Sequence, residues 1–137
     1  MGVAMRARSA SCACGQLRIA CLGEPQKVSL CHCLDCQRRT GSTYGVAAFY
    51  LRKEVRAEGR ASTYKRSSDS GPAVTFHFCS DCGSTVFWEP ERKPEAIAVA
   101  VGSFADPSFP APTQSVWDER RHPWVTFSET PPPSDAD

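Results

Sequence analysis

The chain has 137 residues and a mass of 15.0 kDa, the size of a single domain, with 41% hydrophobic and 23% charged residues, as in globular proteins. Lys and Arg number 16 and Asp and Glu 15, and the resulting formal charge of +1 argues against a protein that binds nucleic-acid backbones. The apolar runs are too short to span a bilayer and no secretory signal follows the first arginines, so we expect a cytoplasmic protein that makes no membrane contact.

The N-terminal half contains two predicted strands and one predicted helix. Residues 1–9 show no periodicity and are expected to form a loose terminus. Gln16–Leu22 alternates apolar and polar residues, and Tyr44–Leu51 is rich in aromatic and aliphatic residues, so both segments are predicted to be strands. Between them, Leu34–Arg39 is the expected helix, and Gly41 is placed to cap its C-terminus.

The second half continues with strands. Ser67–Pro72 is a dense turn signal between Ser62–Arg66 and Val74–Cys79, and this arrangement predicts a hairpin. Thr85–Glu89 and Ala96–Val101 are predicted to be further strands. The last of these contains only small and aliphatic residues, so we expect it to be buried on both faces.

The C-terminal part has the composition of a loop and a tail. Prolines at positions 107, 110, 112 and 123 predict a long loop over the sheet after Gly102. Residues 126–137 contain three consecutive prolines and three acidic residues but no basic residue, so we predict a disordered tail. The expected organisation is one mainly β domain with one short helix, at residues 9–125, followed by that tail.

The eight cysteines are the most informative residues of the sequence. Seven of them fall into short clusters, at Cys12-x-Cys14, Cys31-x-Cys33-x-x-Cys36 and Cys79-x-x-Cys82. Cysteines one or two residues apart rarely satisfy the geometry of a disulfide bond, whereas a tight turn can direct two thiolates at one cation. The spacing therefore predicts zinc, and the alternatives are a secreted disulfide-bonded protein and an iron–sulfur protein.

Ligand counting favours a division of these clusters into two zinc sites. The two pairs provide four thiols, enough to complete a tetrahedral site, and form the four-cysteine group (Cys12, Cys14, Cys79 and Cys82). The remaining cluster is the three-cysteine group (Cys31, Cys33 and Cys36), which would leave one zinc position for water or substrate, as catalytic sites do. In the alternative, Cys21 closes the second site and the protein is a structural zinc module. The alternating segment around Cys21 favours a buried strand residue instead.

Three sequence motifs resemble those of a known family. The motifs are SCACGQLR at 11–18, CHCLDCQRRTGS at 31–42 and FCSDCGSTVF at 78–87. In order, spacing and flanking residues they are similar to the glutathione-dependent formaldehyde-activating enzyme family, whose domain is shared with centromere protein V. The resemblance runs from about residue 9 to residue 125.

The resemblance implies a fold, two cofactor sites and an activity. The fold would be a β-tent of small antiparallel sheets held together by zinc. The four-cysteine group would hold a structural zinc and the three-cysteine group a catalytic zinc. The activity of the family is the condensation of formaldehyde with glutathione to S-hydroxymethylglutathione, which is classed as a carbon–sulfur lyase reaction.

The ligand type indicates how such a site would work. A zinc ion bound by three thiolates is a weak Lewis acid, and it suits the binding and delivery of a soft thiolate. The expected partner is therefore a small-molecule thiol, with glutathione as the thiol that the resemblance implies. The predicted function is a zinc-dependent carbon–sulfur lyase acting on a thiol adduct, and the alternative is a non-catalytic, zinc-stabilised binding module.

Several residues near the three-cysteine group are candidates for catalysis or substrate binding. His32 lies between two ligands and can transfer a proton or support a ligand, unless strand alternation turns it away from the metal. Arg38 and Arg39 can attract substrate carboxylates, with a solvated helix face as the alternative, and Gln37 and Ser42 are weaker candidates of the same kind.

The remaining aromatic residues and histidines have simpler predicted positions. Trp117 and Trp124 either close over the site or pack in the core. His77 alternates with two phenylalanines and is predicted to be a surface strand residue. His122, which follows two arginines, is expected to be solvated.

Overall fold

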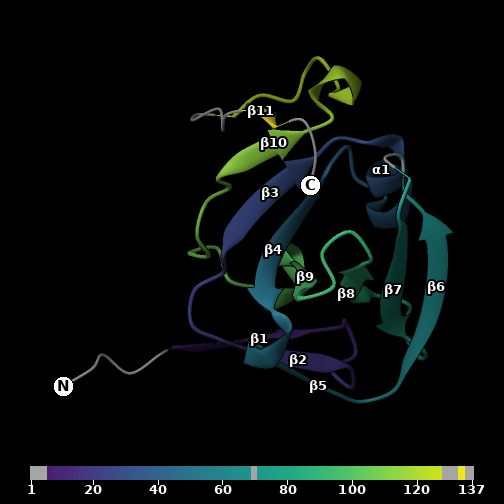
Figure 1. The fold of residues 1–137 in the computed structure, drawn as a ribbon, viewed down its shortest axis with the longest axis vertical. Helices are drawn as coiled ribbons and strands as arrows, with labels where there is room; N and C mark the ends of the chain where they lie inside the picture. Colours follow the sequence, from purple (N-terminus) through teal and green to yellow (C-terminus); the bar gives the residue numbers. More distant parts are fainter. Residues whose placement is uncertain (1–5, 69–70, 128–132, 135–137) are drawn as a thin grey trace.

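The computed structural model describes residues 6–68, 71–127 and 133–134, which form two sheets (Figure 1). The smaller sheet has the order β1-β2-β5, with β1 (Ala7–Ser11), β2 (Arg18–Leu22) and β5 (Val55–Glu58). The larger sheet has the order β11-β10-β3-β4-β9-β8-β7-β6, with β3 (Lys27–Cys31), β4 (Gly45–Leu51), β6 (Ala61–Ser67), β7 (Ala73–Cys79), β8 (Thr85–Pro90), β9 (Ala96–Ala100), β10 (Gln114–Val116) and β11 (Pro133–Ser134).

One α-helix, α1 (Leu34–Thr40), connects β3 to β4. Its start is capped by Cys33, whose sulfur accepts a hydrogen bond from the Cys36 N–H at 3.3 Å. Its end is capped by Gly41 at a φ of 72°, whose N–H donates to the Gln37 carbonyl at 2.8 Å. The described residues also contain three 3-10 helices: η1 (Arg52–Glu54), η2 (Val101–Phe104) and η3 (Asp118–Arg120).

The predicted mainly β fold with one short helix is confirmed. The predicted hairpin is present, because β6 and β7 pair antiparallel. Ala61 lies opposite Cys79 at one end of the pairing, and Ser67 lies opposite Ala73 at the other. Neighbouring strands pair antiparallel except at β10, which lies parallel to both β3 and β11. No helix in the described ranges has the length and apolar character needed to cross a membrane.

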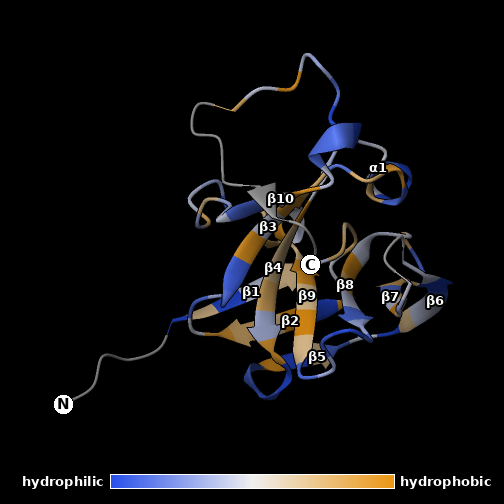
Figure 2. Ribbon diagram, turned by 45° about the horizontal axis from the view of Figure 1, so that its top comes forward, coloured by the Kyte–Doolittle hydropathy of each residue, from blue (hydrophilic) through white to orange (hydrophobic). Residues whose placement is uncertain are grey.

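The central strands of the larger sheet are buried on both faces, as predicted for Ala96–Val101. One face of β4 and β9 packs against β1 and β2 through a buried cluster that includes Tyr50 and Val99. The other face carries a second cluster that includes Phe49, Phe76 and Trp88. Figure 2 shows these hydrophobic strands in the middle of the molecule, with hydrophilic residues on α1. The second cluster supports the pocket described below.

Four strands outside the predicted tail differ from the sequence-based expectation. β1 begins at Ala7, inside the segment expected to be a loose terminus; residues 1–5 lie outside the described residues. β3 and β5 were not predicted; β5, with the sequence VRAE, is an exposed edge strand without an apolar face. β10 interrupts the expected long loop after Gly102 by pairing with β3.

The predicted tail, 126–137, is described only in part. The ring of Phe127 lies 5.6 Å from the ring of Tyr44 in an edge-on arrangement. Pro133–Ser134 forms β11 beside β10. Residues 128–132 and 135–137 lie outside the described residues, so the disorder predicted for them stays a prediction.

Candidate metal centres and the adjoining pocket

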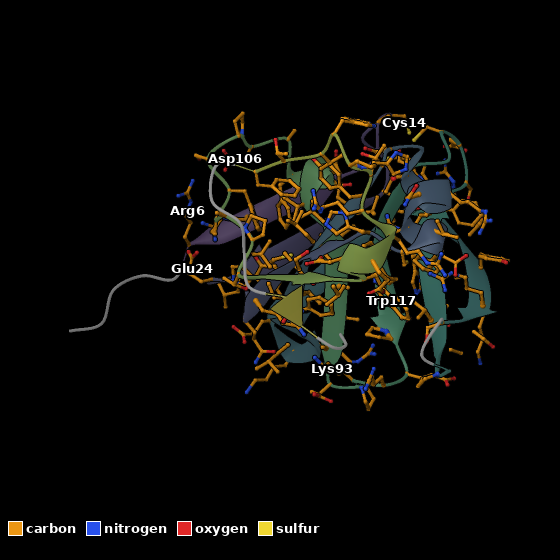
Figure 3. All side chains as sticks on the ribbon, turned by 90° about the horizontal axis from the view of Figure 1, so that it is seen from above. Arg6, Cys14, Glu24, Lys93, Asp106 and Trp117 are labelled. Atoms are coloured by element: carbon orange, nitrogen blue, oxygen red, sulfur yellow. The ribbon has the colours of Figure 1, made fainter. Side chains whose placement is uncertain are left out.

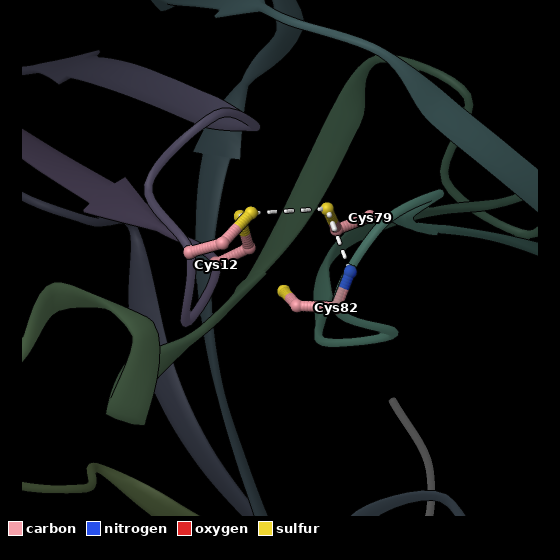
Figure 4. Close-up of side chains that lie close together, drawn as sticks. Cys12, Cys79 and Cys82 are labelled. Atoms are coloured by element: carbon pink, nitrogen blue, oxygen red, sulfur yellow. Dashed lines mark hydrogen bonds between the residues drawn. The ribbon is translucent and has the colours of Figure 1, made fainter.

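The four-cysteine group joins two turns that are far apart in the sequence. Cys12 and Cys14 lie in the turn after β1, whereas Cys79 ends β7 and Cys82 lies in the turn before β8. All four sulfurs lie within 4.8 Å of one another, and Cys14 Sγ is 3.6 Å from Cys12 Sγ and 3.7 Å from Cys79 Sγ. Tetrahedral Zn–S bonds of about 2.3 Å would place sulfurs about 3.8 Å apart. The donors therefore fit a tetrahedral metal ion (Figure 4).

Hydrogen-bond donors surround these sulfurs. Cys79 Sγ accepts hydrogen bonds from the N–H groups of Asp81 and Cys82, each at 3.3 Å, and from Gln16 Nε2 at 2.9 Å. The Ser84 side chain, 3.4 Å from Cys82 Sγ, is the main cause that lowers the pKa of Cys82 to about 5. Such donors stabilise thiolates, the form in which cysteine binds a metal.

The three-cysteine group lies at the other end of the larger sheet, where β3 runs into α1. Cys31 ends β3, Cys33 caps α1 and Cys36 is in the first turn of the helix. Their sulfurs lie within 4.8 Å of one another, so this group too could hold a metal ion. Hydrogen bonds from Cys31 and then Cys36 lower the pKa of Cys33 to about 2. The local structure therefore favours a thiolate at Cys33, and a bound cation would complement that charge.

A pocket with a cavity volume of about 80 Å³ opens beside the three-cysteine group. Its wall contains all three cysteines, the guanidinium groups of two arginines, and four aromatic rings: Cys31, Cys33, Cys36, Arg39, Arg66, Phe49, Phe76, Trp88 and Trp117. Figure 3 labels Trp117 in this wall and Cys14 of the four-cysteine group, which lie apart in that view. The two groups therefore differ, because only the three-cysteine group adjoins this pocket.

The two neighbouring arginines of α1 have different surroundings. The Arg39 guanidinium stacks 4.2 Å from the centre of the Trp88 ring in the pocket wall. Its buried Nε has no hydrogen-bond partner within the described residues. Arg38, by contrast, has a 75% exposed side chain and an ion pair with Asp35 at 3.6 Å, and it lies outside the wall of this pocket.

Gln37 and Ser42 do not line the pocket either. Gln37 Nε2 donates to the His32 carbonyl at 2.9 Å, and Gln37 Oε1 lies 2.8 Å from His122 Nε2. Gln37 thus joins α1 to the C-terminal segment. His122 is half-buried in this contact and not solvated, so that expectation is wrong. Ser42 is exposed after the helix, and its N–H donates to Thr40 Oγ1 at 3.0 Å.

His32, the residue after β3, is fully buried and does not line the pocket. Its ring centre lies 6.0 Å from that of Tyr44, and its Nε2 lies 3.8 Å from Asp118 Oδ1. Burial lowers the pKa of His32, although Asp118 opposes this effect, and a lowered pKa favours the neutral ring. His32 therefore contacts Tyr44 and Asp118 and lies outside the pocket wall.

The other singled-out residues occupy structural positions. Cys21 is fully buried in the core on β2 and belongs to neither cysteine group, and burial raises its pKa to about 12. His77 is not a free surface residue, because it stacks on Phe87 at 4.5 Å and its Nε2 lies 2.6 Å from Glu89 Oε2. Trp124 is 71% exposed and lies outside the pocket wall.

Sequence reasoning missed Arg66, Phe76 and Trp88 as site residues. They lie on β6, β7 and β8, at least 30 positions after the three-cysteine group, and strand pairing brings them to it. A signal for Arg66 was present in the sequence, because it is a basic residue in a strand that pairs with the aromatic strand β7.

Comparisons with known proteins show what the chain is similar to. Among solved structures, the fold is similar to that of a Rhodobacter sphaeroides protein, a Northeast Structural Genomics target, with a TM-score of 0.52 and 22% identity over 69% of this chain and 85% of the other. At this identity the similarity concerns the fold alone. No curated protein matched the chain. The family described as "Glutathione-dependent formaldehyde-activating enzyme" matches residues 7–120, most of the sequence, and the chain therefore belongs to that family.

Proposed function

We propose that the protein is a zinc-dependent carbon–sulfur lyase acting on a thiol adduct, with a reaction like that of S-(hydroxymethyl)glutathione synthase. The four-cysteine group holds a structural zinc ion, and the three-cysteine group holds the catalytic one. One observation carries the proposal: three thiols share a cavity wall with a guanidinium group and aromatic rings, whereas the other four thiols are arranged to complete a tetrahedron.

The reaction balances without an oxidant or reductant. In the synthetic direction the sulfur of a thiol attacks the carbon of formaldehyde, a carbon–sulfur bond forms, and the carbonyl oxygen takes up the proton that the thiol releases. The lyase direction is the reverse. A zinc ion at the three-cysteine group would supply a binding position for the thiolate and lower the pKa of the incoming thiol.

The residues of the chain contribute orientation and shielding. The aromatic rings of Phe76, Trp88 and Trp117 give the cavity wall an apolar surface, which strengthens electrostatic interactions beside it. Arg39 places a positive charge beside the cysteines and attracts an anionic substrate. Every cysteine is free, so we place the protein in a reducing compartment such as the cytoplasm, where glutathione is also available as the thiol.

The test compares two cysteine variants of the metal-loaded protein. Proton NMR would follow the exchange of formaldehyde with S-hydroxymethyl thiol, with glutathione as the thiol. The wild type should accelerate the exchange, and Cys36→Ala should reduce the rate to that of the uncatalysed reaction. Cys21→Ala is the matched control, because it removes a buried thiol outside both groups, and it should retain the wild-type rate.

Two outcomes would contradict the proposal. If the wild type carries two zinc ions and still does not accelerate the exchange with any thiol offered, the chain is the non-catalytic binding module instead. If Cys36→Ala is as active as the wild type, the three-cysteine group is not the catalytic site.

A further inference from the structure

We propose that the pocket selects a small thiol that carries a carboxylate, and that Arg39 is the residue that binds this carboxylate. The inference rests on the proposed function, because it takes the three-cysteine group as the place where the thiol sulfur binds. It goes further by assigning the substrate class and the residue that determines it.

The first argument is the environment of Arg39. Its guanidinium is half-buried, stacked on Trp88 and close to Phe76, at 4.2 Å and 5.8 Å from the ring centres. No carboxylate among residues 6–68 and 71–127 lies within salt-bridge distance of Arg39, and its buried Nε lacks a hydrogen-bond partner there. A planar guanidinium fixed by stacking presents its remaining N–H groups in a fork that matches a carboxylate. The pocket wall therefore carries a positive charge whose binding capacity is unused within the described chain.

The second argument is the charge balance around Arg39. Within residues 6–68 and 71–127, the carboxylate that pairs with the neighbouring cations is that of Asp35, which lies 3.3 Å from Arg66 and 3.6 Å from Arg38. Arg66 also stacks on Phe76 at 5.0 Å, in the same pocket wall. Asp35 thus compensates charge at Arg66 and Arg38, while Arg39 remains available for an anion from solution.

The third argument is distance. A Cβ atom placed on Gly45 would lie 2.8 Å from Arg39 Nη2 and 3.4 Å from Cys36 Cβ. Arg39 Nη2 and Cys36 Cβ are therefore separated by no more than the sum of these distances, about 6 Å. The guanidinium is therefore next to the three-cysteine group. A ligand whose sulfur lies at that group and whose carboxylate reaches Arg39 needs only a short spacer between the two.

The fourth argument is size. At about 10–15 Å³ for each water, a cavity of about 80 Å³ holds roughly six waters, or a similar number of non-hydrogen atoms. 3-Mercaptopropionate has that many. Glutathione has several times as many, so only part of it fits inside this cavity and the rest would extend over the neighbouring surface. The cavity therefore favours the smaller thiol acid.

Binding can be measured apart from catalysis with cobalt in place of zinc. A thiolate that binds to cobalt produces a charge-transfer absorption band, and its titration gives a Kd. The probes are 3-mercaptopropionate, its neutral isostere 3-mercaptopropionamide, and glutathione, all at physiological ionic strength to screen distant charges. We expect the acid to bind at least 10-fold more tightly than the amide, and more tightly than glutathione.

The variants separate Arg39 from general positive charge. Arg39→Gln should abolish the preference for the acid over the amide while the charge-transfer band with the amide persists. Arg39→Lys should restore part of the preference, because it keeps the charge but not the fork. Arg38→Gln is the matched control, since it removes the same charge from the next position of α1, and it should keep the full preference. The d–d absorption of bound cobalt reports whether each variant retains its metal sites.

Each remaining outcome decides between the two proposals. Equal affinity for acid and amide in the wild type, or an equal loss of preference in Arg38→Gln, overturns the role of Arg39 and leaves the proposed function intact. Tighter binding of glutathione than of 3-mercaptopropionate overturns the size argument. A cobalt-loaded protein that shows no charge-transfer band with any of the thiols overturns the proposed function itself.

Discussion

Two cysteines with similar chemistry have different expected roles because of where their side chains lie. Cys12 is buried in the core, accepts a hydrogen bond from the Leu17 N–H at 3.3 Å, and belongs to the group that joins two distant turns. Cys36 is in the first turn of α1 and in the wall of the pocket. We therefore expect the first position to hold the fold together, whereas the second lines a pocket that a ligand can enter.

Cys12→Ala should therefore prevent folding, and Cys36→Ala should not. A structural zinc contributes about 10–16 kcal/mol of apparent binding free energy, as much as the roughly 5–15 kcal/mol of net stability of a whole domain. We expect insoluble or unfolded protein for Cys12→Ala, and a folded protein with one metal ion fewer for Cys36→Ala. Metal analysis and circular dichroism of the soluble fraction would check this. Equal loss of folding in both variants would contradict the division into a structural and a catalytic site.

The connection between β5 and β6 is the element on which the four-cysteine group depends most directly. Gln16 Nε2 donates to the Arg60 carbonyl at 2.7 Å and to Cys79 Sγ at 2.9 Å, and the Arg60 N–H donates to Gln16 Oε1 at 2.9 Å. Gly59 makes this approach possible, because a Cβ there would lie 2.0 Å from the Gln16 carbonyl oxygen at a φ of 102°. The connection thus joins the smaller sheet to the metal ligands.

Gly59→Ala should destabilise the protein more than Gly41→Ala does. Both glycines have positive φ, which costs an alanine about 1–2 kcal/mol, but a Cβ at Gly41 meets nothing within 4 Å. Gly41→Ala is therefore the control for backbone strain alone. At Gly59 the contact with backbone adds to that strain, and we expect a loss of about 3 kcal/mol or more. Urea unfolding of the zinc-loaded variants would measure the difference, and equal losses would show that the contact is relieved.

Elements differ in how well the sequence predicts them. The α1 helix and its Gly41 cap follow from local composition, and so do strands with an apolar face, such as β7 and β8. β5 has no such face and is a strand because its neighbour β2 offers backbone partners from Arg18 to Cys21. β10 likewise depends on its pairing with β3. Pairing with a distant segment is not encoded in the local pattern, so these strands were missed.

The same reason separates the predictable and unpredictable parts of the candidate site. The cysteine groups are recognisable because metal ligation requires short spacings, and the structure brings together the sulfurs that the spacing grouped. The pocket wall has no such signature. Arg66 and Trp88 reach it through a sheet whose order, β4-β9-β8-β7-β6, no local feature of the sequence specifies.

Removal of the metal should affect the molecule as a whole. Treatment with a strong chelator would deprive both sheets of the four-cysteine link, because Cys12 and Cys14 lie between two strands of the smaller sheet and Cys79 ends a strand of the larger one. We expect the cooperative thermal transition followed by circular dichroism to disappear, or its midpoint to fall steeply, and to return when zinc is added. Chelator already saturated with zinc is the control. An unchanged midpoint after verified metal removal would show that the core holds the sheets together alone.

The wide separation of the two turns also bears on how the protein is made. Cys12 and Cys14 emerge from the ribosome 65 or more residues before Cys79 and Cys82, an interval of roughly 3–13 s at about 5–20 residues per second. During this time the early thiols are exposed on a nascent polypeptide without the partners that would protect them from oxidants. Cellular zinc supply at the moment of hairpin emergence therefore helps determine how many newly synthesised chains mature.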